Sequence, residues 1–245
     1  MARILFITER YPPQIGGVAV SAGRLVRGLA GRGHLVHVAS LGADAEPGTV
    51  RSELDDGVLV HRLGALEAPD LSLPLAERVL VHLHARVHFD LFHGHFLAPA
   101  GYLAAYLGRR LGVPSYVSVR GNDVDRGMFA PALLPQVLWT LQHAGGIGCV
   151  SHELIAKARA LSGREDAAYT PNSVAVDVFT PREPDPARCA EFGGAPRLGF
   201  VGELRFKKGT AFLLEAFRHV RADRPATLLL VGGLRGEDRA FLRHF

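Results

Sequence analysis

Apolar residues along this chain fall into two alternating patterns, short continuous runs and runs with helical spacing. The run RILFIT at 3–8 lacks polar alternation, which is typical of a strand covered on both faces. From Val18 to Leu29 the apolar positions recur at helical spacing, and glycines at 31–34 end that helix before the apolar run at 35–40. A strand, a helix and a second strand in this order predict two parallel strands.

The same alternation continues along most of the chain. Further strands are predicted at 58–63, at 90–95, up to Val119 and at 146–151, and helices near Pro74, from Pro99 to about Leu111, at 133–144 and at 151–161 with Ser151 as N-cap. Because strands and helices alternate, the predicted fold class is α/β, with a doubly wound parallel sheet.

The alternation of predicted strands and helices stops in the proline-rich stretch 181–196. Such a stretch is typical of a linker, here between a first domain at 1–180 and a second at 197–245. The second domain begins with a strand at 197–202, a helix at 210–222 and a strand at 226–233. Two strands with one helix provide little apolar cover. We therefore expect the second domain to be incomplete and the chain to be truncated.

Composition narrows the classes of protein. The 245 residues are 48% hydrophobic, which is enough for a large core. The formal net charge is +4, but the basic residues are scattered along the sequence and form no patch, so nucleic acid is not an expected partner. Cys149 and Cys189 form no paired motif, which fits a reducing compartment. No apolar run reaches the roughly 20 residues that span a bilayer, and no cleavage pattern follows the N-terminal run. We expect a cytoplasmic protein without a transmembrane segment.

Two adjacent glycines, Gly16 and Gly17, lie between the first strand and the first helix. Ligands of open α/β sheets bind at the carboxyl ends of strands, where helix N-termini present free N–H groups to anions. A glycine pair lets the backbone approach a phosphate or a sugar closely, and Pro12 and Pro13 stiffen the chain before it. The alternative is a tight turn without a ligand. The stretch matches neither the dinucleotide fingerprint nor a P-loop.

The second domain has a similar loop, GELRFKKG at 202–209, between a strand and a helix. Its Arg205, Lys207 and Lys208 would suit a diphosphate. The alternative is an exposed basic loop without a ligand.

Five histidines lie within 82–95, but they divide between a helix and a strand and lack the glutamate of a zinc motif, so no metal site is predicted. Most of them fit a solvated helix edge. His95 differs because it ends its strand, and Arg120, Asn122 and Asp123 follow the next strand at the same edge of the sheet.

Six stretches taken in order resemble the retaining glycosyltransferases of family four, which have the GT-B architecture. They are ILFITERYPPQIGGVA, LAGRGHLVHV, DLFHGHFLAPAG, VPSYVSVRGNDV, PNSVAVDVFTP and LGFVGELRFKKGTAFLLEAF. The resemblance covers the chain from end to end. It implies two Rossmann-like domains, the second incomplete, and transfer of a sugar from a nucleotide-sugar donor with retention of configuration and without an obligatory metal or other cofactor.

The resemblance also implies roles for individual residues. Gly16, Gly17, Arg205 and Lys208 would bind the donor phosphates, Arg120, Asp123 and His95 would form the catalytic group, and Tyr11 and Asn122 would lie on the acceptor side. Electrostatic stabilisation of the departing diphosphate would be the main catalytic effect.

Three departures from the family pattern are visible. Glu203 stands where the family has arginine, and Arg205 is the candidate to replace it. Arg120 stands where the family often has a histidine that contacts the donor sugar. The family's E-x7-E motif would lie downstream of this chain.

The acceptor is expected to be a glycan or a lipid-linked molecule, the latter at the inner membrane face, and a partner chain could complete the second domain. The alternative function is a non-catalytic module that binds an acceptor or a partner. A nicotinamide-dependent oxidoreductase is disfavoured because the glycine fingerprint is missing.

Overall fold

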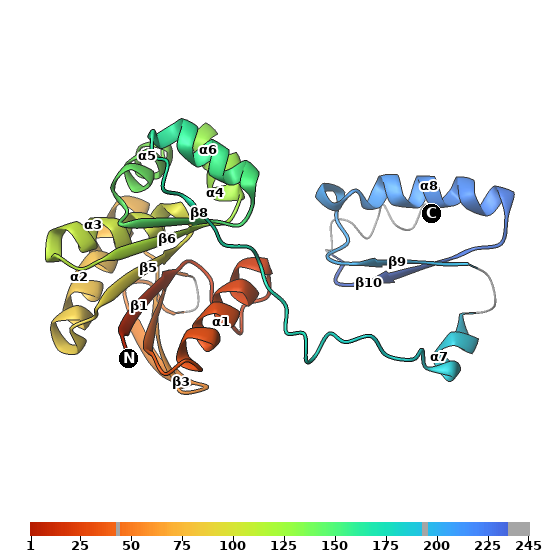
Figure 1. Ribbon diagram of the computed structural model, residues 1–245, viewed down its shortest axis with the longest axis horizontal. Helices are drawn as coiled ribbons and strands as arrows, with labels where there is room; N and C mark the ends of the chain where they lie inside the picture. The colour runs from red at the N-terminus through yellow and green to blue at the C-terminus, as the bar shows by residue number, and fades with distance from the viewer. Residues whose placement is uncertain (43–44, 193–195, 235–245) are drawn as a thin grey trace. The chain divides into compact units, whose positions relative to one another are not determined.

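The computed structural model describes residues 1–42, 45–192 and 196–234. The chain divides into two compact units, Met1–Ser173 and Val174–Phe245 (Figure 1). The stretch predicted as a linker lies in the second unit and contains a short helix, α7 (Pro186–Glu191), which Asp185 caps by accepting from the main-chain N–H groups of Ala187 and Arg188. The Asp-Pro pair explains this helix, because proline suits the first helical position.

The first unit holds a sheet and the helices around it. Its strands are β1 (Arg3–Thr8), β2 (Leu35–Ser40), β3 (Val50–Asp55), β4 (Val58–Leu63), β5 (Leu91–His95), β6 (Ser115–Val119), β7 (Gly146–Cys149) and β8 (Ala168–Tyr169). Its helices are α1 (Gly17–Ala30), α2 (Pro69–Val87), α3 (Tyr102–Leu111), α4 (Asn122–Asp125), α5 (Leu134–His143) and α6 (His152–Ser162), with short helical turns η1 (Leu97–Gly101) and η2 (Gly127–Phe129).

The strand order is β3-β4-β2-β1-β5-β6-β7-β8, and every neighbouring pair is parallel except β3 with β4. The register pairs Thr8 with His95 and His95 with Ser118. The last residues of β1, β5 and β6 therefore meet at one edge of the sheet, as the sequence predicts. The α/β fold class with a parallel sheet is confirmed.

Helices cover both faces of this sheet (Figure 1). Ala22 and Val26 of α1 pack with apolar residues of β1, β2 and β4 on one face. Residues of α2 and α3, including Leu80 and Leu103, pack on the other face. Helices α5 and α6 cover β6 and β7. The continuous apolar runs in the strands are thus buried on both sides, which is the arrangement that their lack of alternation predicts.

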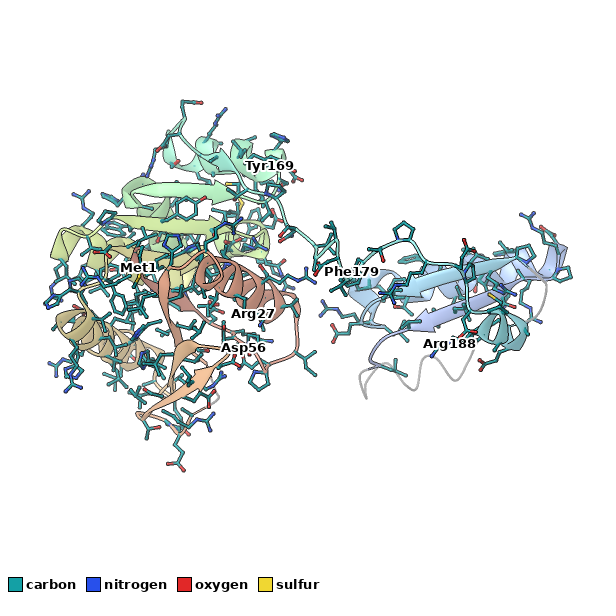
Figure 2. All side chains as sticks on the ribbon, turned by 60° about the horizontal axis from the view of Figure 1, so that its bottom comes forward. Met1, Arg27, Asp56, Tyr169, Phe179 and Arg188 are labelled. Carbon is teal, nitrogen blue, oxygen red and sulfur yellow. The ribbon has the colours of Figure 1, made fainter. Side chains whose placement is uncertain are left out.

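Two elements differ from the sequence prediction. Strand β3 was not predicted; it pairs antiparallel with β4 through a turn that includes Asp56, which is labelled in Figure 2. Asp56 and Gly57 have φ of 48° and 78°. A turn of this kind suits a two-residue hairpin. Helix α2 starts at Pro69, not near Pro74, and Pro74 lies inside its second turn.

A chain of polar side chains crosses β2, β4 and β3 and is buried at His37 and His61. His37 Nδ1 lies 3.1 Å from His61 Nε2, and Ser52 Oγ lies 2.8 Å from His61 Nδ1. Burial, together with the neighbouring His37, lowers the pKa of His61 to about 4. These side chains are therefore neutral at pH 7 and satisfy one another's hydrogen-bonding groups.

The second unit contains the parallel strands β9 (Arg197–Val201) and β10 (Thr227–Val231), the helix α8 (Thr210–Asp223) and the helical turn η3 (Phe206–Lys208). The strand, helix and strand predicted for this region are confirmed. The alternation of strands and helices predicts a next helix after 226–233, but the final eleven residues, 235–245, lie outside the described residues.

Candidate functional site

The loop between β1 and α1 carries the glycine pair. Gly16 is the N-cap of α1 and has φ of 144°, a backbone conformation that favours glycine. Gly17 begins the helix without such a φ, and a Cβ added at Gly17 would meet no heavy atom of the protein within 4 Å. Glycine is therefore required by the backbone at position 16, whereas nothing in the described protein requires it at position 17.

A buried arginine anchors this loop. Arg62 on β4 is 2% exposed, and its Nη2 donates to the main-chain oxygen of Pro12 at 2.6 Å. Its Nε donates to Oε1 of Glu53 on β3, also at 2.6 Å. This hydrogen bond lowers the pKa of Glu53. The proline segment is thus held to β4 through a charge-assisted contact.

Tyr11, assigned from the resemblance to the acceptor side, lies in the core instead. It is 1% exposed and packs with Ala22 and Val26 of α1. Burial is the main cause that raises the pKa of its hydroxyl. The aromatic ring packs beneath α1, and a role on the acceptor side stays a prediction.

Three side chains from three elements meet at the carboxyl edge of the sheet. Ser21 on α1 has its Oγ 3.3 Å from Nε2 of His95 at the end of β5. Nη2 of Arg120, which follows β6, donates to the same Ser21 oxygen and to Oδ1 of Asn172. Ser21 lies one helical turn after Gly17, so this cluster adjoins the glycine pair.

His95 is fully buried and neutral. Burial, with Arg120 and His93 nearby, lowers the pKa of His95 to about 3. Because Ser21 accepts from Arg120, its own proton is available to His95 Nε2, which leaves the ring hydrogen on Nδ1. Within the described residues this Nδ1 has no hydrogen-bond partner. His93, also expected at a solvated edge, is buried and lies 2.9 Å from Ser118 Oγ.

Asp123 is 8% exposed and turned toward the main chain. Its carboxylate accepts from the N–H groups of Arg120 and Gly121, the latter at 2.7 Å, and from that of Leu97 at 3.3 Å. Burial raises its pKa, and these main-chain hydrogen bonds oppose the rise. The arrangement favours a role in holding the turn after β6 over contact with a substrate. Asn122 is exposed at the start of α4.

Sequence reasoning missed Ser21 and Asn172. Asn172 follows β8, in the PNSV stretch, and the neighbouring Ser173 accepts through its main-chain oxygen from Arg24 of α1 at 3.0 Å. Ser21 could have been found from its position four residues after Gly17, which places it on the same helix face.

The predicted phosphate-binding residues of the second unit lie in and beside η3. Arg205 Nε lies 3.1 Å from Oε2 of Glu203. Glu203, which stands at the arginine position of the family pattern, therefore forms an ion pair with Arg205, the candidate to replace that arginine. The main-chain N–H of Arg205 donates to Thr210 Oγ1. Lys208 is exposed one residue before Gly209, the N-cap of α8. The structure brings these residues together within one loop of the second unit.

Among the described residues, no group of three or more histidine, cysteine, aspartate or glutamate side chains could hold a metal ion. The helices of the described ranges include none with the length and apolar character needed to cross a membrane.

The sequence profile of Glycosyltransferase Family 4 matches residues 15–175. The chain belongs to this family. It is similar to a GDP-mannose-dependent alpha-mannosyltransferase of Mycobacterium tuberculosis, with 36% identity over 50% of this chain and 32% of that protein. It is also similar to an N-acetyl-alpha-D-glucosaminyl L-malate synthase of Bacillus anthracis, with 24% identity over 90% of this chain and 59% of that protein. The chain thus spans about one to two thirds of the length of these relatives.

Solved structures confirm the GT-B type of fold. A sucrose-phosphate synthase from Thermosynechococcus elongatus matches 100% of this chain and 66% of its own, with a TM-score of 0.71 and 19% identity. HepE of Anabaena in complex with UDP and glucose matches 100% of this chain and 64% of its own, with a TM-score of 0.68 and 16% identity. The match to Glycosyltransferase Family 4 does not favour the alternative of a non-catalytic module.

Proposed function

We propose that this chain binds a nucleoside diphosphate sugar and takes part in transferring the sugar, with retention of configuration, to an acceptor held by the unit Met1–Ser173. The observation that carries the proposal is Gly17. The described protein leaves open space where a side chain at this position would lie. A glycine at the helix start, beside Ser21 and Arg120, is explained by a ligand that approaches the backbone closely.

The proposed transfer requires stabilisation of the negative charge on the departing diphosphate. The bond between the anomeric carbon and the diphosphate oxygen breaks, a bond to the acceptor oxygen forms on the same face, and the acceptor proton leaves with the diphosphate. Negative charge develops on the departing phosphate, and the start of α1 presents main-chain N–H groups without a side-chain cap. Within the second unit, Lys208 offers an exposed positive charge for a phosphate, whereas Arg205 already pairs with Glu203.

The relatives support the donor class. One is named as dependent on GDP-mannose, and one similar structure holds UDP and glucose. We therefore propose a nucleoside diphosphate sugar as donor and a glycan or a lipid-linked molecule as acceptor. Burial lowers the pKa of His95 to about 3, which makes its ring a weak base, and the Asp123 carboxylate is bound to main-chain N–H groups, so neither is proposed as the base that accepts the acceptor proton.

The test begins with calorimetric titration of the 245-residue chain with GDP, UDP and ADP. We expect saturable binding of at least one of them, weakened about tenfold or more by Lys208→Ala. Arg218→Ala, which removes an exposed arginine of α8 paired with Glu215, is the matched control. Incubation with GDP-mannose or UDP-sugars, followed by mass spectrometry, then measures transfer or donor hydrolysis. A chain that neither binds a nucleoside diphosphate nor consumes a donor would contradict the proposal.

A further inference from the structure

Arg120 uses only part of its hydrogen-bonding capacity. Its Nη2 donates to Ser21 Oγ and to Asn172 Oδ1, both neutral acceptors. In the described ranges, its Nε and Nη1 donate to no acceptor. A guanidinium group has five N–H donors, so most of them remain available at the edge of the sheet.

No carboxylate in the described part of the chain pairs with Arg120. Asp123, the nearest acidic residue in sequence, directs its oxygens to main-chain N–H groups. Two other arginines that are buried or half-buried do have carboxylate partners: Arg62 pairs with Glu53, and Arg164 pairs with Asp166. Arg120 therefore carries a positive charge that no described side chain neutralises through an ion pair.

This charge is also partly removed from water. Burial lowers the pKa of the Arg120 guanidinium, and the charge of Asp123 only partly opposes this. An unpaired cation at such a position costs free energy, which a ligand of opposite charge would offset. Ser21 and Asn172 fix the orientation of the guanidinium, and a fixed guanidinium with unused donors suits a carboxylate or a phosphate.

We propose that Arg120 binds an anionic oxygen group, a carboxylate or a phosphate, of the molecule that occupies this edge of the sheet. The inference rests on the proposed function, because that function places a substrate there. The group comes either from an acidic acceptor or from the donor diphosphate.

The experiment is calorimetric titration of the 245-residue chain with inorganic phosphate and, separately, with succinate. We expect saturable binding of at least one of these probes, about ten- to a hundredfold weaker in Arg120→Gln and retained in part by Arg120→Lys. The matched control is Arg126→Gln, which removes an exposed arginine six residues further along and should leave the affinity unchanged. Circular dichroism checks that each variant folds, and Arg120→His replaces Arg120→Gln if the latter does not.

Repeating the titration with saturating GDP distinguishes the two sources of the anion. Competition between GDP and phosphate assigns the anion to the donor, whereas unchanged phosphate or succinate binding assigns it to the acceptor. Equal affinities of the wild-type chain and Arg120→Gln for both probes, or no saturable binding of either probe, would overturn the inference. GDP, UDP and ADP binding reports separately on the proposed function. A chain that binds one of these nucleotides without Arg120-dependent anion binding therefore refutes this inference alone.

Discussion

Nη2 of Arg62 lies 2.6 Å from the main-chain oxygen of Pro12, which links strand β4 to the segment that leads into the glycine pair. The position of Gly16 and Gly17 thus depends on a side chain that lies 50 residues from Pro12 in the sequence. Because Arg62 is buried and also pairs with Glu53, the loop is held by a contact that solvent cannot readily replace.

Replacing this arginine should destabilise the protein. Arg62→Met keeps much of the volume but removes the hydrogen bonds to Pro12 and Glu53, and we expect a loss of about 2–4 kcal/mol in the free energy of unfolding. Urea denaturation measures it. Arg51→Met is the control, because Arg51 pairs with the same Glu53 but is exposed, and should change stability by less than about 0.5 kcal/mol. Equal losses in both variants would show that the Pro12 contact contributes little.

The buried His37 and His61 pair predicts a loss of stability in acid. His61 has a pKa of about 4 in the folded protein against 6.5 for an unperturbed histidine, since burial disfavours the charged ring. The unfolded chain therefore binds more protons between these values, and the contribution of His61 is present above pH 6.5 and lost as the pH falls toward 4.

His61→Gln isolates this contribution from those of other buried histidines. The difference in free energy of unfolding between pH 7 and pH 4.5 should be smaller in the variant than in the wild type by about 2–3 kcal/mol. Urea denaturation at the two pH values gives the comparison, with His82→Gln at an exposed position as the control. The same pH dependence in all three proteins would contradict a buried neutral pair.

Gly17→Ala separates stability from ligand binding. The added methyl group meets open space, so the free energy of unfolding should stay unchanged or rise by up to about 1 kcal/mol. Nucleoside diphosphate affinity should nevertheless fall tenfold or more, because the methyl group occupies the path of the ligand. Gly28→Ala on the same helix, where the nearest neighbour is the flexible end of Arg32, should leave binding intact. Wild-type affinity in Gly17→Ala would argue against close approach at this residue.

Asp123→Ala should act mainly through stability. The main-chain N–H groups of Arg120 and Gly121 at the turn after β6, and that of Leu97 after β5, would lose their acceptor, at a cost of about 2 kcal/mol. Asp123→Asn, which keeps one carbonyl oxygen, should cost less. Thermal unfolding measures the stability of each variant, and nucleotide titration measures its affinity for the ligand. A stable Asp123→Ala variant with abolished turnover would instead assign Asp123 to the chemistry.

Most of the fold follows from the apolar pattern, because buried parallel strands leave an unmistakable run such as residues 3–8. Strand β3 does not follow from it. Its residues are mostly exposed and polar at the edge of the sheet, so it lacks an apolar run, and only its turn residues Asp56 and Gly57 signal a hairpin.

The sequence predicts where the candidate site lies on the sheet, but it does not predict which groups His95, Arg120 and Asp123 contact. Strand order places the ends of β5 and β6 together, which is why His95 and Arg120 could be assigned to one edge. Ser21 reaches His95 and Arg120 because of the way α1 is rotated about its axis. Asp123 faces main-chain N–H groups because of the conformation of the turn after β6. Both are set by packing, which spacing along the sequence does not encode.

The hairpin turn at Asp56 and Gly57 has a practical consequence. Exposed two-residue turns are attractive places to insert a tag or to permute a chain. Here the turn joins the two strands that carry Glu53 and Arg62, and Arg62 holds the segment before the glycine pair. An insertion that shifts β3 against β4 would weaken the contact between Arg62 and Pro12 and so loosen the loop before the glycine pair. Protein engineers should therefore keep labels away from this turn.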